Sequence, residues 1–243
     1  MSNNLCYIII INYNSYFNTT NSIKSILESN YSFYHIILVD NGSTDDSLRS
    51  MKKKYFNETK VTCIKSDKNG GYASGINLGI KYSVNKKDCK YLWVLNNDTM
   101  IFNDALEELI FAENSTDDLK IWGSKILNPD LTIQSLGCRL NKYFMWTNHN
   151  YSGCRDIFYH KSSYKVDYIH GCSIFFNKEI INKVGLFDES YFLFYEDVDF
   201  SIKSIENNIL LDICDRSKVI HKENSTINEM HYQYYSTTNR LKI

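Results

Sequence analysis

The chain has 243 residues, of which 43% are hydrophobic and 23% are charged, so it can bury a sizeable core and is not disordered as a whole. Its 27 Lys and Arg residues are balanced by 28 Asp and Glu residues, and the formal charge of -1 argues against nucleic acid as the main partner. The longest apolar run, residues 5–11, is far shorter than the ~20 residues of a membrane-spanning helix, and no signal peptide is recognisable. These features predict a soluble cytoplasmic protein.

Seven cysteines lie at positions 6, 63, 89, 138, 154, 172 and 214. They form no C-x-x-C pair and are odd in number, which favours reduced thiols over a disulfide framework or a zinc knuckle. We predict that most of them are small core residues.

The first half of the chain alternates between apolar runs and amphipathic segments. We predict strands at 7–11, 36–39, 61–64 and 91–95, and helices at 19–27, 47–55, 72–82 and 103–112. The run 7–11 is continuous and rich in isoleucine, as in a strand that is buried on both faces. Strand–helix alternation at this spacing is typical of a parallel α/β sheet with helices on its faces.

The alternation ends near residue 120. We predict strands at 120–127, 132–136 and 166–176, helices at 178–184 and 198–207, and two short strands around Leu210 and Val219. The aromatic stretch 143–164 has no clear period and is predicted to be a loop. Because no repeat or low-complexity linker marks a boundary, one domain with a mixed second half is favoured.

Polar side chains follow each of the first four predicted strands. The four ends read Asn12-Tyr13-Asn14, Asp40-Asn41-Gly42-Ser43, Asp67-Lys68-Asn69-Gly70-Gly71 and Asn96-Asn97-Asp98-Thr99. Ligands of open α/β sheets bind at the carboxyl ends of the strands. Together these ends predict a nucleotide site, although each one alone could be a turn.

Two of the strand ends carry candidate ligand carboxylates. Asp40 could accept a hydrogen bond from a base or a ribose, or could belong only to a turn that caps the next helix. Asp98, with Asn96 beside it, could ligate Mg²⁺ or Mn²⁺ that also binds a diphosphate, or could begin an Asx-turn. His221 could complete that metal site as a neutral imidazole, or could be a structural histidine.

Three carboxylates lie within four positions, at Glu196, Asp197 and Asp199. They repel one another, so one or two resist ionisation unless a cation or a substrate hydroxyl compensates. The alternative is that they are acids at a helix N-terminus, where the helix dipole favours them. The aromatic residues within 191–195 would line a dry pocket, in which a carboxylate is a candidate general base.

These motifs together resemble the inverting glycosyltransferases of family 2, and within that family the rhamnosyltransferase-like branch. The matching segments follow the family's order along nearly the whole chain: 10–14, 39–45, 69–77, 95–99, 171–172, 184–189, 192–199, 221 and 234–240. The chain departs from the family at Asn96, where an Asp is common, and at Lys203, where an Arg is usual. Many members also continue past the region of Arg240 with further helices, so an acceptor-binding or membrane-docking segment is an open question.

The resemblance implies a GT-A fold, which is an α/β fold with a Rossmann-like, mostly parallel central sheet, helices on both faces and a mixed C-terminal half. It implies a single domain, 1–243, with a nucleotide-binding half at 1–115 and an acceptor-binding and catalytic-base half at 116–243. It also implies transfer of a sugar from a UDP- or dTDP-linked donor to a hydroxyl of a glycan or lipid-linked saccharide. The transfer would invert the anomeric carbon and serve bacterial surface polysaccharide synthesis.

Site residues follow from the same resemblance. Asp197 would be the base, with Glu196 and Asp199 positioning it or the acceptor, and Asp98 and His221 would hold Mn²⁺ or Mg²⁺. Tyr13 would stack on the base and Asp40 would accept from its imide, within a nucleotide-sugar site that comprises Asn12, Tyr13, Asn14, Asp40, Lys68, Gly71, Asn77, Asn96 and Asn97. No nucleic acid partner is expected, and peripheral association with the inner face of the cytoplasmic membrane is left open.

Two other classes of function are weighed against this one. A sugar-nucleotide nucleotidyltransferase has a similar sheet but needs a Gly-rich, basic loop after the first strand, where this chain has Asn12-Tyr13-Asn14-Ser15. A non-catalytic nucleotide-sugar or carbohydrate-binding module would be favoured if the acidic cluster were broken, and it is intact. Both alternatives are therefore disfavoured.

Overall fold

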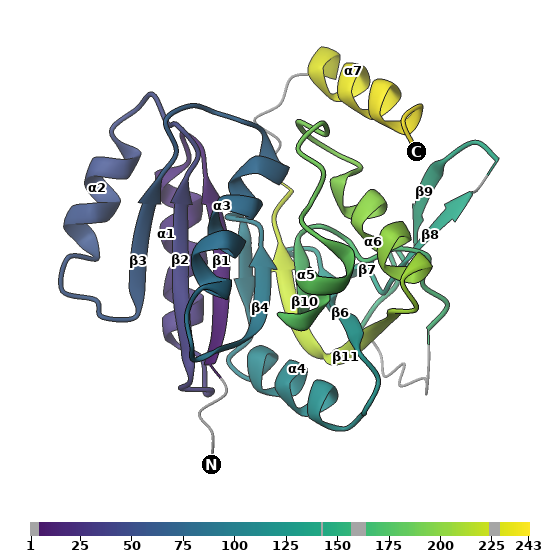
Figure 1. Ribbon diagram of the computed structural model, residues 1–243, viewed down its shortest axis with the longest axis horizontal. Coiled ribbons are helices and arrows are strands. Elements are labelled where there is room, and N and C mark those ends of the chain that lie inside the picture. The colour runs from purple at the N-terminus through teal and green to yellow at the C-terminus, as the bar shows by residue number, and fades with distance from the viewer. Residues whose placement is uncertain (1–4, 142, 157–163, 224–228) are drawn as a thin grey trace.

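Figure 1 shows the computed structural model of the chain, which describes residues 5–141, 143–156, 164–223 and 229–243. Within these ranges, nine strands form one sheet in the order β3-β2-β1-β4-β10-β6-β11-β5, with β7 paired to β6. The strands of the sheet are β1 Leu5–Asn12, β2 Tyr34–Asp40, β3 Val61–Lys65, β4 Cys89–Leu95, β5 Thr99–Ile101, β6 Lys120–Leu127, β7 Ile133–Ser135, β10 Ser173–Asn177 and β11 Leu210–His221. A separate hairpin is made of β8 Cys138–Asn141 and β9 Trp146–His149.

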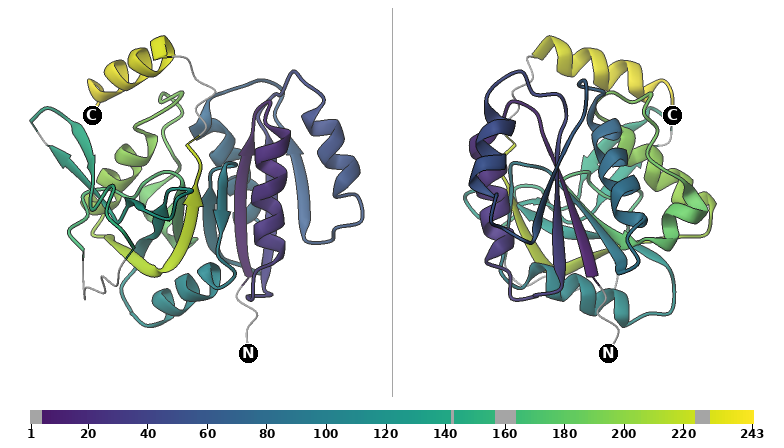
Figure 2. Two further views of the ribbon diagram at one scale, coloured as in Figure 1. Left: turned by 180° about the vertical axis from the view of Figure 1, so that it is seen from behind. Right: turned by 60° about the vertical axis from the view of Figure 1, so that its left-hand side comes forward.

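Helices cover both faces of the sheet, as the right-hand view of Figure 2 shows for the first half of the chain. They are α1 Tyr16–Leu27, α2 Ser47–Lys54, α3 Tyr72–Val84, α4 Ala105–Asn114, α5 Glu179–Val184, α6 Glu196–Glu206 and α7 Glu229–Arg240. On one face, α1, α2 and α4 bury residues such as Ile23, Met51 and Leu106 in a common core. On the other face, α3, α5 and α6 bury residues such as Ile76 and Phe200.

Strand direction decides which segments meet at the upper edge of the sheet in Figure 1. The strands β1 to β4 pair in parallel, so their carboxyl ends share this edge. β10 runs antiparallel to β4 and pairs Ser173 with Leu95, so the residues that enter β10 lie beside the residues that leave β4. β11 runs antiparallel to β5 and pairs His221 with Thr99. The sheet thereby brings residues 96–98, 171–172 and 221 together.

The structure confirms the α/β fold class and all eight elements predicted for the first half. The largest difference among them is at α1, which begins at Tyr16 rather than at residue 19. β1 is buried along nearly its whole length, as expected for a strand covered on both faces. In the second half, β6 has the predicted bounds 120–127, and β7, α5 and α6 lie close to their predicted positions.

Two predictions for the region 143–176 are corrected. A strand was predicted at 166–176, but only Ser173–Asn177 is β10. Tyr168 and Ile169 suggested that the strand starts earlier, but they are apolar because they pack into the core outside any strand. A loop was predicted at 143–164, but Trp146–His149 forms β9 and pairs with β8. Its residues are nearly all exposed and show no alternation of buried and exposed positions, so the sequence pattern did not reveal this strand. Residues 157–163 of that stretch lie outside the described residues.

Further corrections concern the end of the chain and one short strand. The two strands predicted around Leu210 and Val219 are one strand, β11, whose register against β6 shifts between Cys214 and Lys218. The polar residues in that shift explain why the pattern suggested two strands. Neither α7 nor the three-residue β5 was predicted; β5 is too short to carry a period.

All seven cysteines lie in described residues, and none of them is disulfide-bonded. Five are buried, which confirms that most are core residues, while Cys63 is partly exposed and Cys154 is exposed. Within the described ranges, no helix combines the length and apolar character needed to cross a bilayer.

Candidate active site

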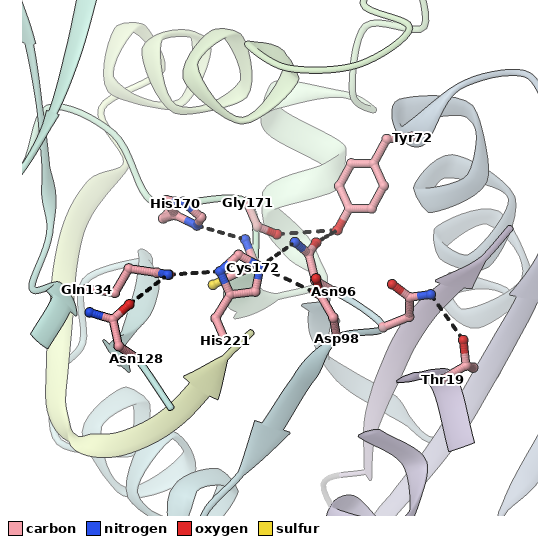
Figure 3. Close-up of polar contacts among 11 residues, drawn as sticks. Thr19, Tyr72, Asn96, Asp98, Asn128, Gln134, His170, Gly171, Cys172 and His221 are labelled. Atoms are coloured by element: carbon pink, nitrogen blue, oxygen red, sulfur yellow. Dashed lines mark hydrogen bonds and ion pairs between the residues drawn. The ribbon is translucent and has the colours of Figure 1, made fainter. Parts of the chain in front are cut away.

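The predicted metal ligands meet at the carboxyl edge of the sheet (Figure 3). Asp98 follows β4, His221 ends β11, and the His221 Nε2 atom lies 3.3 Å from the Asp98 Oδ1 atom. That carboxylate oxygen is buried and has no hydrogen-bond partner. Asn96 directs its Nδ2 group to the same His221 Nε2 atom at 3.3 Å. The structure therefore brings together two candidate ligand atoms that lie 123 positions apart in sequence (221 less 98).

The acidic cluster begins α6 beside this edge. Phe194 and Tyr195 adopt left-handed backbone angles, with φ of 66° and 72°, and turn the chain sharply into the helix. From α7, the amide of Asn239 donates to the carbonyls of Leu193 and Phe194 at 2.8 and 3.0 Å. The strained turn is thus held by a side chain from the end of the chain, and it directs the first residues of α6 towards the site.

Asp197 is tied to the segment that enters β10. Its Oδ2 atom accepts a 2.7 Å hydrogen bond from the Gly171 N–H, and its Oδ1 atom accepts from the Val198 N–H at 2.8 Å. A Cβ atom on residue 171 would lie 3.1 Å from Asp197 Oδ2, so glycine allows this close approach. Asp197 keeps part of its surface accessible, whereas Glu196 is only 5% exposed.

Tyr72 connects the acidic residues of α6 to the predicted metal ligands. Its hydroxyl donates to the Asn96 Oδ1 atom and lies 3.4 Å from the Gly171 carbonyl oxygen (Figure 3). Burial raises the pKa of Tyr72 well above its ordinary range, and the nearby carboxylates of Glu196, Asp98 and Asp197 raise it further. Tyr72 therefore stays protonated and can donate to Asn96 at any physiological pH.

Both carboxyl groups at the start of α6 resist ionisation. Burial raises the pKa of Glu196, and the adjacent Asp197 raises it further. Burial also raises the pKa of Asp197, while the N–H groups of Gly171 and Val198 act in the opposite direction. Since a general base works best with a pKa near the working pH, both groups are suited to proton transfer.

We expect the replacement Glu196→Gln to raise the unfolding temperature at pH 9 and to change it much less at pH 4. A carboxyl group whose pKa is raised on folding adds stability below its ordinary range, and that stability is lost as the pH rises through the raised value. Glutamine cannot ionise, so the variant avoids this loss; each recovered kcal/mol is worth roughly 2–4 °C. Thermal scans across pH should show a difference that grows with pH.

Glu206→Gln is the matched control, because Glu206 is exposed at the other end of the same helix. Its difference from the wild type should be small and nearly constant with pH. If Glu196→Gln also gave the same difference at pH 4 and pH 9, the Glu196 carboxyl group would not be the group that burial perturbs.

Asp199, the third acidic residue, faces a different direction. Its Oδ2 atom pairs with Lys203 Nζ at 2.7 Å, and the same ammonium lies 3.8 Å from Asp188. Lys203 stands at the position where the family usually has an Arg, so this ion pair keeps a cation beside the acidic helix start. The structure therefore separates Asp199 from the Asp197–Gly171 contact, and its role in positioning the base or acceptor stays a prediction.

The predicted nucleotide-binding residues of β1 and β2 form one polar network. Asp40 is fully buried, and its oxygens accept from the Asn12 amide at 2.9 Å and from the Ser43 N–H at 3.1 Å. The Asn12 amide also donates to Ser43 Oγ at 3.0 Å. Exposed Asn14 accepts a 2.8 Å bond from the Thr44 N–H, so the loops after the two strands are joined. Direct contact of Asn12, Asn14 or Asp40 with a nucleotide stays a prediction.

Gly71 and Asn77 join α3 to the loop that precedes α6. Gly71 has a φ of 89°, and a Cβ atom there would lie 2.4 Å from the Phe192 carbonyl oxygen, so only glycine fits without a shift. Asn77 is 1% exposed, and its amide exchanges hydrogen bonds with the Phe187 backbone at 2.8 and 3.0 Å. It also donates to Glu189 at 2.9 Å. These contacts position the loop that precedes α6, while nucleotide binding by Gly71 or Asn77 stays a prediction.

The remaining predicted residues lie at the same edge. Tyr13 is 44% exposed, as a ring that stacks on a base must be, and Lys68 is exposed in the loop after β3. Asn97 donates to Thr19 Oγ1 at 3.1 Å, and Thr19 in turn donates to Asn12 at 2.8 Å. The Asn97 side chain therefore connects the metal-ligand segment to the Asn12 network.

Sequence reasoning did not single out Tyr72 or Gln134. Tyr72 directly follows Gly71 in the Gly-rich segment, so its position was visible but its contact with Asn96 was not. Gln134 lies in the middle of short β7 and contacts His221. A polar residue beside apolar Ile133 in a buried strand is the available signal, and it does not say which partner satisfies the side chain.

Comparisons with known proteins agree with this architecture. The family model described as "Glycosyl transferase family 2" matches residues 7–185. The chain is 26% identical over 242 residues to low-salt glycan biosynthesis hexosyltransferase Agl10 of Haloferax volcanii, and the alignment covers 94% of this chain and 71% of that protein. It is 24% identical over 225 residues to dTDP-rhamnosyl transferase RfbF of Shigella flexneri, with coverages of 91% and 70%.

Solved structures share the fold at low sequence identity. A crystal structure of GalNAc-T7 with UDP, GalNAc and Mn²⁺ superposes with a TM-score of 0.73 at 15% identity, covering 90% of this chain and 44% of the other. Residues 1–349 of TarS from S. aureus superpose with a TM-score of 0.66 at 15% identity, covering 97% of this chain and 71% of the other. The fold is therefore GT-A, and this chain spans less than half of the GalNAc-T7 chain.

Proposed function

Since the chain belongs to glycosyl transferase family 2 and is thus a glycosyltransferase that uses a nucleotide-sugar donor, we propose that it is a metal-dependent, inverting member of the family. The donor is UDP- or dTDP-linked, and the acceptor is a hydroxyl of a glycan or lipid-linked saccharide in surface polysaccharide synthesis. Residues 1–115 form the nucleotide half of a single domain, 1–243, and residues 116–243 form the acceptor half. The enzyme works in the cytoplasm, at or near the inner face of the membrane.

One observation carries the mechanistic part of this proposal. A chain of contacts runs from Asp197 through Gly171 and Tyr72 to Asn96 and His221. It joins a carboxylate suited to proton transfer to a pair of metal-ligand atoms at one edge of the sheet. An inverting transfer needs these two functions on opposite sides of one reacting carbon. Asp197 and His221 lie outside residues 7–185, which the family model matches, so their roles are argued from these contacts.

The Asp98–His221 pair fits a divalent cation. A buried carboxylate oxygen without a hydrogen-bond partner lies 3.3 Å from an imidazole nitrogen. Carboxylates suit Mn²⁺ and Mg²⁺, and a neutral imidazole is a common metal ligand beside them. No group of three candidate ligand side chains occurs among the described residues, so diphosphate oxygens and water would complete the coordination. When bound, the cation would act as a Lewis acid that neutralises the diphosphate leaving group.

Asp197 acts as the general base of the transfer. Its carboxylate takes the proton of the acceptor hydroxyl while that oxygen forms a bond to the anomeric carbon. The bond from that carbon to the diphosphate oxygen breaks, and attack from the opposite face inverts the configuration. The Gly171 and Val198 N–H groups hold the carboxylate in place during this step. The Asp197 charge raises the pKa of Glu196, which is buried beside it, so Glu196 stays protonated while Asp197 serves as the base.

We expect Asp40→Ala to weaken UDP or dTDP binding by about 1–3 kcal/mol, the range for loss of a hydrogen bond to a charged acceptor. Titration calorimetry with each nucleotide measures this directly. Ser43→Ala is the control, because it removes the hydroxyl that joins Asn12 and Asn14 but keeps the carboxylate. An equal loss in both variants would make Asp40 a loop-positioning residue and not a reader of the base.

A donor panel tests the proposed function as a whole. We expect one UDP- or dTDP-sugar to raise the unfolding temperature more than the other donors do, and to do so more strongly with Mn²⁺ present. Transfer to an acceptor with that donor should then give a product of inverted anomeric configuration by ¹H NMR. Equal stabilisation by all donors with and without Mn²⁺, or a product of retained configuration, would overturn the proposal.

A further inference from the structure

Gln134 contacts His221 on the side away from Asp98. Gln134 is 7% exposed in β7, and its Oε1 atom lies 2.8 Å from the His221 Nδ1 atom. Its Nε2 group donates to Asn128 Oδ1 at 3.2 Å, and Figure 3 shows His221, Gln134 and Asn128 in this order. The Asn128 amide donates to Thr132 Oγ1 at 2.9 Å. His221 is thus the last member of a row of hydrogen-bonded side chains.

The direction of these hydrogen bonds is fixed at the far end of the row. The Thr132 hydroxyl and N–H both donate to Asp130 Oδ1, at 2.7 and 3.0 Å. These bonds lower the pKa of Asp130, so its carboxylate is ionised at neutral pH and can only accept. Because the hydroxyl proton of Thr132 is committed to Asp130, its oxygen must accept from the Asn128 amide. Asn128 then presents an oxygen to Gln134, and Gln134 presents an oxygen to His221.

The reversed arrangement fails at the same carboxylate. If Gln134 donated to His221, its oxygen would face Asn128 Oδ1 unless the Asn128 amide also turned over. With the Asn128 amide rotated, its Oδ1 atom would face Thr132 and would accept the Thr132 hydroxyl proton. The Thr132 and Asp130 oxygens would then lie 2.7 Å apart without a proton between them. Only one direction satisfies every member of the row.

The consequence for His221 is a defined tautomer. An oxygen at 2.8 Å requires the proton to be on Nδ1, which leaves a lone pair on Nε2 directed at Asp98. Asn96 is compatible with this tautomer: its Oδ1 atom accepts from Tyr72, so its Nδ2 group faces His221 Nε2 at 3.3 Å, a longer contact than the 2.8 Å bond to Gln134. A metal ligand of this kind needs such a free nitrogen.

We propose that Gln134 is a positioning residue that holds His221 in the Nδ1–H tautomer and so keeps Nε2 ready to bind a divalent cation, with Asn128, Thr132 and Asp130 setting its direction. This inference rests on the proposed metal-dependent function. Mutation of a residue that hydrogen-bonds the second ring nitrogen of a metal-ligating histidine typically lowers metal affinity 10–100-fold. The proposal therefore concerns metal binding and not the stability of β7.

Two substitutions separate positioning from packing. Gln134→Met keeps the length of the side chain but cannot accept the Nδ1 proton, whereas Gln134→Glu restores an acceptor oxygen. If Gln134 positions His221, Met should lower Mn²⁺ affinity 10–100-fold and Glu should restore it. If Gln134 only fills space in a buried strand, the apolar Met should be harmless and the buried carboxylate of Glu should be the damaging change.

The tautomer can be read without metal or substrate. Long-range ¹H–¹⁵N NMR spectra of histidine-labelled wild-type protein at pH 8 should show His221 protonated on Nδ1, with His221→Ala identifying the signal. Gln134→Met should move part or all of the population to the Nε2–H form, and Gln134→Glu should return it. An Nε2–H signal in the wild type, or an unchanged signal in Gln134→Met, would overturn the inference.

Mn²⁺ binding is then measured by the loss of the free Mn²⁺ signal in electron paramagnetic resonance, with Mn²⁺ alone and with Mn²⁺ plus UDP. Wild type that binds no Mn²⁺ would overturn both the proposed metal dependence and this inference. Loss of binding in His221→Ala together with unchanged binding in Gln134→Met would overturn the inference alone. Loss in both, with rescue in Gln134→Glu, is the expected result, and metal-free thermal scans check that each variant is folded.

Discussion

The variant Asp197→Asn is expected to lose sugar transfer by two to four orders of magnitude while it still binds donor and Mn²⁺. Asparagine keeps the shape of the side chain but cannot take a proton, and a positioned base typically contributes 10²–10⁴-fold. The acceptor hydroxyl is a poor nucleophile without such help. Transfer rates at saturating donor and acceptor, compared with calorimetric donor affinity, measure the loss of catalysis separately from binding.

Asp199→Asn provides a comparison on the same helix. Because the Asp199 carboxylate pairs with Lys203 and not with Gly171, we expect a far smaller loss of transfer. A comparable rate for Asp197→Asn and the wild type would move the base elsewhere, with buried Glu196 as the next candidate. Thermal scans of both variants exclude a loss that comes from unfolding.

The pH dependence provides a second readout of the base. Asp197 must be ionised to accept a proton, so kcat/KM should rise with pH as the pair of carboxyl groups titrates. Burial raises the pKa of Asp197, which places this acid limb at a higher pH than an ordinary aspartate would give. Glu196→Gln should leave this limb nearly unchanged, because the Asp197 charge raises the pKa of Glu196, so that Glu196 is still protonated while Asp197 ionises.

The variant Asp98→Ala is expected to lose metal-dependent turnover while remaining folded. Its side chain is 12% exposed at the end of a strand, and its Oδ1 atom has no hydrogen-bond partner, so removing it costs the core little. Loss of one of the two proposed protein ligands should weaken Mn²⁺ binding and leave the diphosphate leaving group without a Lewis acid. Turnover against Mn²⁺ concentration measures the effect, and higher Mn²⁺ should recover part of it.

Asp104→Ala is the matched control, because Asp104 is exposed at the start of α4 and its side chain makes no capping hydrogen bond. It should keep its dependence on Mn²⁺ unchanged. Full turnover of the wild type in excess EDTA would show that the transfer does not need a divalent cation, and the Asp98–His221 pair would then need another explanation.

Local sequence patterns determined the first half of the fold. Continuous apolar runs such as β1 can be buried only in a sheet that is covered on both faces, and the amphipathic segments between them supply the cover. Parallel strands place their carboxyl ends at one edge, so the polar residues after β1, β2, β3 and β4 were predicted to form one site without any knowledge of contacts. The acidic start of α6 was identified from the local sequence alone, because three carboxylates within four positions repel one another.

The tertiary structure alone decided which partners those residues contact. Asp197 is distinguished from Asp199 by a hydrogen bond to Gly171, 26 positions away, and Asn77 is directed to Phe187 at a separation of 110. Gln134 meets His221 only because β7 and β11 both pair with β6, on opposite sides. Such partners are set by strand order and register, which depend on the packing of the whole sheet. Sequence periodicity records which side of an element is buried, but not which residue lies against it.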